Sequence, residues 1–339
     1  MKAGIIGWPG SGRDAIFSAL TGLARPPFGS ADPRQGEALV PDERLDRLSA
    51  MFQPKKHTPA KVEFLLPHPQ GQPKEVLKTS LEKVRETEVL LLILRNFEQD
   101  GADPPEPAKE IAELESELVV NDYLVVEKRL ERLAEEAKRG KKNDPEELEL
   151  LNRAKADLEA GQPLRHDPIF ASSPKLKGFA FLSAKPLLAV LNNADEDGNA
   201  VDLGGSWPLV VVRGRLEEEL AGMEPDDAAD FLAEYDLTEP AAARVIREVY
   251  RLMGLISFFT VGDDECRAWT IAKGESALEA AGAIHSDIQK GFIRAEVVAY
   301  DEFIAAGGMN EAKKKGSFRL EGKTYVVADG DIVHFRFNV

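Results

Sequence analysis

A short apolar strand that runs into a glycine-rich turn is the feature that most restricts how this chain can fold. Residues 2–6 are apolar after Lys2, Gly7 opens the turn, and residues 14–20 take up helical spacing. Gly7 and Gly12 have the separation found in phosphate-binding loops, G-x-x-x-x-G-K-S/T, between a strand and a helix. Such a turn lets backbone N–H groups converge on an anion at the positive end of the helix. The sequence therefore predicts a strand, an anion-binding loop and a helix.

Four later apolar runs have the length of strands. They lie at residues 62–66, 89–94, 187–191 and 209–212, and helical or loop segments separate them. Near-continuous apolar strands are typical of a parallel sheet that is covered on both faces. Together with the first loop, they predict an α/β fold with a doubly wound sheet of the P-loop NTPase type.

Three parts follow from the distribution of residue types. Residues 106–163 are rich in Glu, Lys, Leu and Ala with helical periodicity, and a turn at 138–145 predicts a helical hairpin. This insertion divides the α/β domain into residues 1–105 and 164–255, and residues 256–339 read as a small α+β module. Residues 216–239 hold ten acidic residues and no basic ones, which predicts one solvated amphipathic helix.

Composition excludes several classes of protein. The chain has 43 basic and 59 acidic residues and a net charge of −16, which argues against broad attraction to nucleic acid. No apolar run approaches the ~20 residues that span a bilayer, and the amino-terminal run turns glycine-rich too early for a secretory signal. We expect a cytoplasmic protein with no membrane partner. The single cysteine, Cys266, excludes an internal disulfide and a cysteine-based metal site.

Two residues of the loop depart from the phosphate-binding pattern. Arg13 stands where lysine reaches the phosphates, and Asp14 stands where a hydroxyl ligates Mg²⁺. Arginine keeps the charge, but its wide fork fits a tight cradle poorly. A carboxylate 4 Å from phosphate would oppose binding by ~4 kcal/mol at an effective dielectric of ~20, unless Mg²⁺ bridged the two. Alternatively, Asp14 itself satisfies the N–H groups of the first helical turn.

Several further segments resemble one known family, the YchF subfamily of Obg-type P-loop NTPases, also called Obg-like ATPases. The segments are residues 4–7, 36–46, 85–88, 196–198, 267–271 and 281–296. The last of these is the strongest and is similar to the family's carboxy-terminal TGS domain. The resemblance implies a G-type domain, a coiled-coil insertion and a β-grasp-like TGS module, in the order drawn above.

The resemblance also locates the residues that would organise Mg²⁺. The aspartate of the family's D-x-x-G motif matches Leu66, its glycine matches Pro69, and the threonine of the first switch matches Ser30. Leu66 and Asp14 together remove both protein groups that normally organise the metal. We therefore predict no catalytic residue, no metal ligand and at most a weak NTPase activity.

The motif that reads the base is ambiguous. Asn192 and Asp195 satisfy N-x-x-D, whose carboxylate accepts the two N–H donors of guanine. Asn193 and Glu196 satisfy the N-x-x-E form that the resemblance implies, which is associated with tolerance of adenine. The same residues are also ordinary turn formers. The sequence leaves the choice between guanine and adenine open.

We predict a regulatory protein that binds GTP or ATP weakly, without an organised Mg²⁺ site, and associates with the ribosome or RNA. The candidate nucleotide-binding residues are Gly7, Gly10, Ser11, Gly12, Arg13, Asp14, Ala15, Asn192, Asn193, Asp195 and Glu196. The candidate RNA contacts are Lys138, Arg139, Lys141, Lys142, Lys290 and Arg294. The basic residues of the hairpin also fit a solvated helix face. The alternative function is a scaffold that has lost nucleotide binding and presents the hairpin and TGS module to a protein or RNA.

Overall fold

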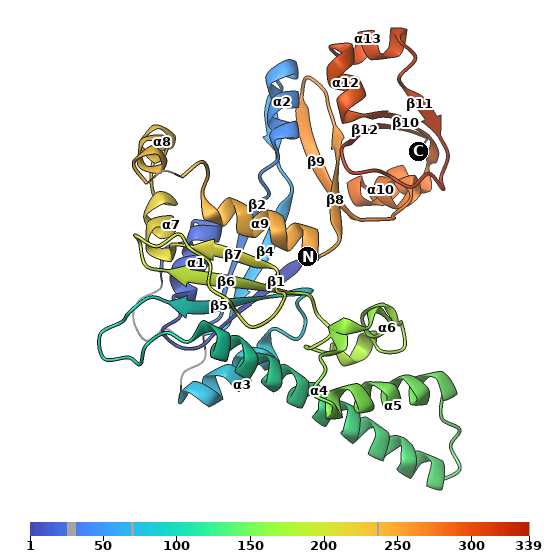
Figure 1. Ribbon diagram of the computed structural model, residues 1–339. Coiled ribbons are helices and arrows are strands. Elements are labelled where there is room, and N and C mark those ends of the chain that lie inside the picture. The colour runs from blue at the N-terminus through green and yellow to red at the C-terminus, as the bar shows by residue number, and fades with distance from the viewer. Residues whose placement is uncertain (26–31, 69–70, 236, 339) are drawn as a thin grey trace. The chain divides into compact units, whose positions relative to one another are not determined.

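The computed structural model describes residues 1–25, 32–68, 71–235 and 237–338 (Figure 1). By compactness the chain divides into a first unit, Met1–Glu37 with Glu63–Val245, and a second unit, Ala38–Val62 with Ile246–Val339. Residues 38–62 thus belong with the carboxy-terminal part, although the sequence placed them in the α/β domain. The three-part division remains a prediction.

The first unit is built on a six-stranded sheet in the order β2-β4-β1-β5-β6-β7. Its strands are β1 (Lys2–Ile6), β2 (Arg34–Leu39), β4 (Lys61–Leu66), β5 (Val89–Asn96), β6 (Leu187–Asn193) and β7 (Leu209–Val212). The registered pairs β1–β4, β1–β5, β5–β6 and β6–β7 are all parallel. Each apolar run singled out in the sequence forms a strand, so the predicted α/β fold is confirmed.

Helices cover both faces of this sheet. The helices are α1 (Arg13–Thr21), α3 (Pro73–Lys83), α4 (Pro107–Lys138), α5 (Pro145–Glu159), α6 (Pro168–Ser172), α7 (Gly214–Leu220), α8 (Pro225–Glu234) and α9 (Ala241–Leu252). Short 3₁₀ turns occur at Leu164–His166 and Lys177–Phe179. Figure 1 shows α1 and α7 on one face and α3 and α4 on the other. Coverage of both faces explains why β5 and β6 are apolar at consecutive positions.

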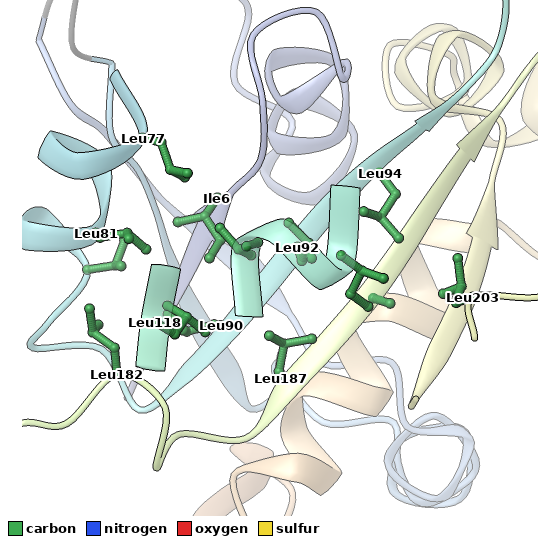
Figure 2. Packing of buried hydrophobic residues seen from close by; sticks show 14 of the residues in the cluster. Ile6, Leu77, Leu81, Leu90, Leu92, Leu94, Leu118, Leu182, Leu187 and Leu203 are labelled. Carbon is green, nitrogen blue, oxygen red and sulfur yellow. The ribbon is translucent and has the colours of Figure 1, made fainter. Parts of the chain in front are cut away.

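The core under α3 and α4 is rich in leucines. Leu90, Leu92 and Leu94 alternate along β5 and meet Leu81 of α3 and Leu118 of α4 (Figure 2). Each is less than 2% exposed. Burial of one such side chain contributes about 1.5–3 kcal/mol, so this cluster anchors the sheet that carries the glycine-rich loop.

The helical insertion begins and turns where the sequence indicated. Helix α4 ends at Lys138 and α5 starts at Pro145, and the two lie side by side (Figure 1). Asp144 caps α5 by accepting hydrogen bonds from Glu146 N (3.0 Å) and Glu147 N (3.5 Å). Val126, Leu133 and other apolar residues of both helices share a buried cluster with the segment that follows α5. The coiled-coil description of this hairpin remains a prediction.

The acidic segment departs from the single solvated helix that the sequence predicted. It forms two short helices, α7 and α8, because Gly222 and Pro225 interrupt the helical run. Glu217 is 4% exposed and accepts hydrogen bonds from Ala241 N (2.8 Å) and Ala242 N (3.0 Å) at the start of α9. One acid of this segment is therefore a buried helix cap rather than a surface charge.

The second unit holds a six-stranded mixed sheet in the order β11-β10-β12-β8-β9-β3. Its strands are β3 (Lys56–Thr58), β8 (Leu255–Thr260), β9 (Glu265–Ala272), β10 (Phe292–Ala299), β11 (Arg319–Glu321) and β12 (Asp331–Phe337). Its helices are α2 (Glu43–Phe52), α10 (Ala277–Ile284), α11 (Ser286–Lys290), α12 (Tyr300–Ala306) and α13 (Met309–Lys314). Residues 38–62 join this unit because β3 pairs with β9 in parallel. Among the described residues, no helix is long and apolar enough to cross a membrane.

Candidate functional site

The glycine-rich loop connects β1 to α1 and is tied to a second loop by one asparagine. Asn192, at the end of β6, donates to Ser11 O (2.9 Å) and accepts from Gly214 N (2.9 Å) at the start of α7. Gly12 has a φ of 87°, and a Cβ there would lie 2.2 Å from Asn192 Nδ2. Only glycine fits this left-handed, crowded position. The amide of Asn192 therefore sets the shape of the loop.

A cleft of about 660 Å³ opens beside this loop, within the usual size of a ligand pocket. The predicted residues that line it are Gly10, Gly12, Arg13, Asp14, Ala15, Asn192, Asn193, Asp195 and Glu196. Ser11 is 1% exposed and lies behind the loop, as does the buried Gly7. The cleft is also lined by residues that are not among the predicted nucleotide-binding residues: Arg25, Phe97, Glu98, Gln99, Ala194 and Arg215. Of these, residues 97–99 directly follow the buried strand β5, and Ala194 lies within the N-x-x-D motif.

Arg13 is the most distinctive side chain of the cleft. Its Nη1 atom is buried and, within the described part of the chain, has no hydrogen-bond partner. Burial lowers the pKa of the Arg13 guanidinium, and the nearby carboxylate of Asp14 opposes that shift. The Ser11 hydroxyl is also buried, and none of the described residues is its hydrogen-bond partner. Buried donors without partners are rare in folded proteins, and a positive one is relieved by an anion.

Asp14 contacts two side chains that the sequence did not indicate. It lies in the first turn of α1, where a carboxylate favours the helix dipole. Its Oδ1 atom lies 3.1 Å from Arg34 Nη1 and 3.1 Å from His68 Nε2. The arginine neutralises the carboxylate, and the repulsion expected against phosphate is reduced accordingly.

The residues around Asp14 do not fit a Mg²⁺ site. Mg²⁺ requires a near-octahedral set of oxygen ligands. Leu66 ends β4 with a fully buried apolar side chain, and both carboxylate oxygens of Asp14 already contact protein nitrogen atoms. Across the described ranges, no three His, Cys, Asp or Glu side chains are grouped to hold a metal ion. The two other family positions, Ser30 and Pro69, lie outside the described residues.

Successive asparagines at the end of β6 point in different directions and have different partners. Asn193 donates to Asp197 O (3.0 Å) and Asn199 O (2.8 Å) and accepts from Asn96 (2.9 Å), so its amide shapes its own turn. Asn192 is the residue that reaches the glycine-rich loop. This geometry favours the register of Asn192 and Asp195 over that of Asn193 and Glu196.

Asp195 follows β6 and is far from the glycine-rich loop in sequence, but it lines the same cleft. Its side chain is 26% exposed and lies 3.8 Å from Arg215 Nε. Burial raises the pKa of Asp195, and Arg215 lowers it. Arg213 donates to the Asp195 carbonyl oxygen (3.1 Å), which holds this turn against the start of α7.

Comparison with known proteins covers the whole chain. It is 36% identical to "Ribosome-binding ATPase YchF" of Bacillus subtilis, with 100% of each chain covered. It is 38% identical to the protein of that name in Haemophilus ducreyi, with 100% of this chain and 99% of the relative covered. The chain belongs to the YchF family of Obg-like ATPases. The YchF-GTPase_C domain model, described as a protein of unknown function (DUF933), matches residues 255–338.

Solved structures agree with the assignment to the YchF family. The structure of the Schizosaccharomyces pombe YchF GTPase matches with a TM-score of 0.81 and 25% identity, over 99% of this chain and 97% of that one. A plant relative in Oryza sativa, "Obg-like ATPase 1", is 32% identical over 100% of this chain and 92% of its own. The expected family membership and fold are thereby confirmed.

The basic residues predicted to contact RNA lie on two separate parts of this YchF-family chain. Lys138, Arg139, Lys141 and Lys142 are exposed at the end of the hairpin in the first unit. Arg139 and Lys141 pair with Glu135 (3.7 Å) and Glu136 (2.8 Å) of α4. In the second unit, Arg294 is exposed on β10, and Lys290 lies 3.7 Å from Asp287. Pairing within the hairpin reduces the free positive charge at its tip.

Proposed function

We propose that this protein is a purine-nucleotide-binding regulator that associates with the ribosome and hydrolyses its nucleotide slowly or not at all. The observation that carries the proposal is Arg13, a half-buried cation that lines a cleft beside the glycine-rich loop and whose buried Nη1 donor has no partner among the described residues. Relatives named "Ribosome-binding ATPase YchF", which share the full length of the chain, support the ribosomal association.

The cleft offers phosphate groups a cation and a rigid turn. Arg13 would donate charge-assisted hydrogen bonds, each of which is worth about 1.5–3 kcal/mol. The loop N–H groups and the start of α1 would add the favourable end of a helix dipole. An anion would also relieve the cost of burying Arg13 without a partner. These contributions favour a polyphosphate over an uncharged ligand.

Slow hydrolysis follows from the side chains that are absent from the loop and from β4. Phosphoryl transfer depends on Mg²⁺ and on groups that position it beside the transferred phosphate. Leu66 offers no oxygen, and Asp14 is engaged with Arg34 and His68. Leu66 and Asp14 also support weak nucleotide binding, because no Mg²⁺ ion would bridge these residues and the phosphates.

We assign base reading to Asp195, with Asn192 holding the loop in place. A carboxylate at Asp195 accepts the two N–H donors of guanine, whereas adenine presents an acceptor there. The Asp195→Asn variant should therefore lose about tenfold or more in affinity for GTP and gain affinity for xanthosine triphosphate, whose 2-oxygen accepts from the new amide. Competition titration with GTP, ATP and xanthosine triphosphate measures this change.

Glu196→Gln is the control for this prediction. It removes the charge of the carboxylate that belongs to the other register. The order of the affinities for GTP, ATP and xanthosine triphosphate should stay unchanged. Loss of GTP preference in Glu196→Gln, with none in Asp195→Asn, would assign the base contact to the register of Asn193 and Glu196 instead.

Equilibrium binding of fluorescent GTP and ATP tests the proposed function. We expect saturable binding of at least one nucleotide at concentrations up to about 100 μM. Absence of saturable binding for both would reject a nucleotide-dependent regulator. If neither nucleotide binds but the protein still co-sediments with ribosomes from a low-salt lysate, the result would support the alternative function. The protein would then be a nucleotide-free scaffold that presents the hairpin and TGS module.

A further inference from the structure

An ion-pair bridge joins three segments that a Mg²⁺-bound nucleotide normally joins in P-loop proteins. The segments are the first turn of α1, the start of β2 and the residues after β4, represented by Asp14, Arg34 and His68. All three belong to the first unit. Asp14 and Arg34 are 20 positions apart, and Asp14 and His68 are 54 apart. No local sequence pattern brings them together.

Arg34 is held firmly in place by its surroundings. Its side chain is 9% exposed and its Nη2 atom donates to Leu23 O (2.9 Å) and Ala24 O (3.0 Å). The guanidinium also lies 4.3 Å from the centre of the Phe17 ring, and it donates to Ser18 Oγ (3.2 Å). A buried arginine with this many partners cannot swing away without losing several hydrogen bonds. These contacts anchor the Arg34 guanidinium beside Asp14.

His68 completes the bridge from the other side of Asp14. Its Nε2 atom lies 3.1 Å from Oδ1 and 3.2 Å from Oδ2 of Asp14, so one imidazole N–H spans both carboxylate oxygens. With the proton on Nε2, His68 donates to the carboxylate in either charge state. Leu66, two residues earlier, is buried where a metal-supporting acid would be needed.

We propose that Asp14, Arg34 and His68 form a protein-supplied substitute for the Mg²⁺ bridge. This inference rests on the proposed nucleotide site and adds two properties to it. The bridge holds β2 and the segment after β4 against α1 whether or not nucleotide is bound. Phosphate binding in the cleft is independent of divalent cations, because Asp14 is already neutralised and Arg13 provides the free charge.

Two measurements test the proposal separately. Binding of fluorescent GTP is compared in Mg²⁺ and in EDTA, and we expect the two dissociation constants to agree within about threefold. Tightening beyond about threefold by Mg²⁺ would overturn the proposal. If fluorescent GTP binds under neither condition, the proposed function fails, and the second measurement alone decides whether the bridge exists.

The second measurement is amide hydrogen exchange of the nucleotide-free protein. Peptides that cover residues 34–37 and 64–68 should exchange at least about tenfold faster in Asp14→Asn and in Arg34→Gln than in the unmodified protein. The control Glu149→Gln, an exposed carboxylate of α5, should change neither peptide. Unchanged exchange in both bridge variants would show that other contacts hold these segments, and the proposal would be wrong.

Discussion

Replacement of Arg13 by methionine is expected to weaken GTP or ATP binding by about 10- to 100-fold, since it removes the charge-assisted hydrogen bonds to phosphate. The same replacement should raise the free energy of unfolding of the nucleotide-free protein by about 1 kcal/mol. Methionine fills most of the arginine volume without a buried charge, and Arg13 Nη1 has no partner among the described residues. Binding titration and urea denaturation measure the two effects.

The opposite signs of these two effects distinguish a ligand-binding arginine from a structural one. A structural arginine stabilises the fold, so its loss lowers the free energy of unfolding. Arg132→Met is the matched control, because Arg132 is exposed on the hairpin and pairs with Glu136 (3.2 Å). We expect it to change neither nucleotide affinity nor stability appreciably. Unaltered affinity in Arg13→Met would remove the central support for the proposed function.

Replacement of Asp122 by alanine is expected to lower the free energy of unfolding by about 3–5 kcal/mol. Asp122 lies on α4 with 0% exposure and accepts from Leu182 N (3.0 Å), Ser183 N (2.6 Å) and Ser183 Oγ (2.7 Å). Alanine would leave two backbone N–H groups buried without partners. Burial raises the pKa of Asp122, and the hydrogen bonds from Ser183 and Leu182 oppose the shift.

Urea denaturation followed by tryptophan fluorescence tests the Asp122 prediction. Trp8 and Trp207 pack against the core of the first unit, so a Trp269→Phe background confines the signal to that unit. Glu117→Ala, an exposed change on the same helix, should stay within about 0.5 kcal/mol of the parent. A loss below about 1 kcal/mol in Asp122→Ala would show that water replaces the carboxylate as hydrogen-bond acceptor.

Much of the fold could be predicted because its signals are local. The apolar runs at 62–66, 89–94, 187–191 and 209–212 each form a strand, with ends shifted by at most two residues. The hairpin turn was also predictable, since Gly140 and Pro145 interrupt helical periodicity. The acidic segment forms two helices instead of the predicted one, because Gly222 and Pro225 interrupt the helical run.

The candidate site was predictable in position but not in its contacts. Spacing of Gly7 and Gly12 placed the loop, and nine of the eleven proposed nucleotide-binding residues line the cleft. The choice between Asn192 and Asn193 could not be made, because adjacent strand residues point to opposite sides and sequence alone does not say which side faces the loop. Arg25 of the cleft was missed, since it lies in no motif.

Spacing and residue type were enough to locate the glycine-rich loop and to identify Arg13, Asp14 and Leu66 as departures from the usual P-loop pattern. These are properties of spacing and residue type, which local conformational preferences convert directly into a strand, a turn and a helix. The contacts of Asp14 depend on how the chain packs, because its partners come from β2 and from the residues after β4. The same holds for residues 38–62, whose place in the second unit depends on a strand pairing across about 200 positions. Side-chain pairing over such separations follows from how the elements pack.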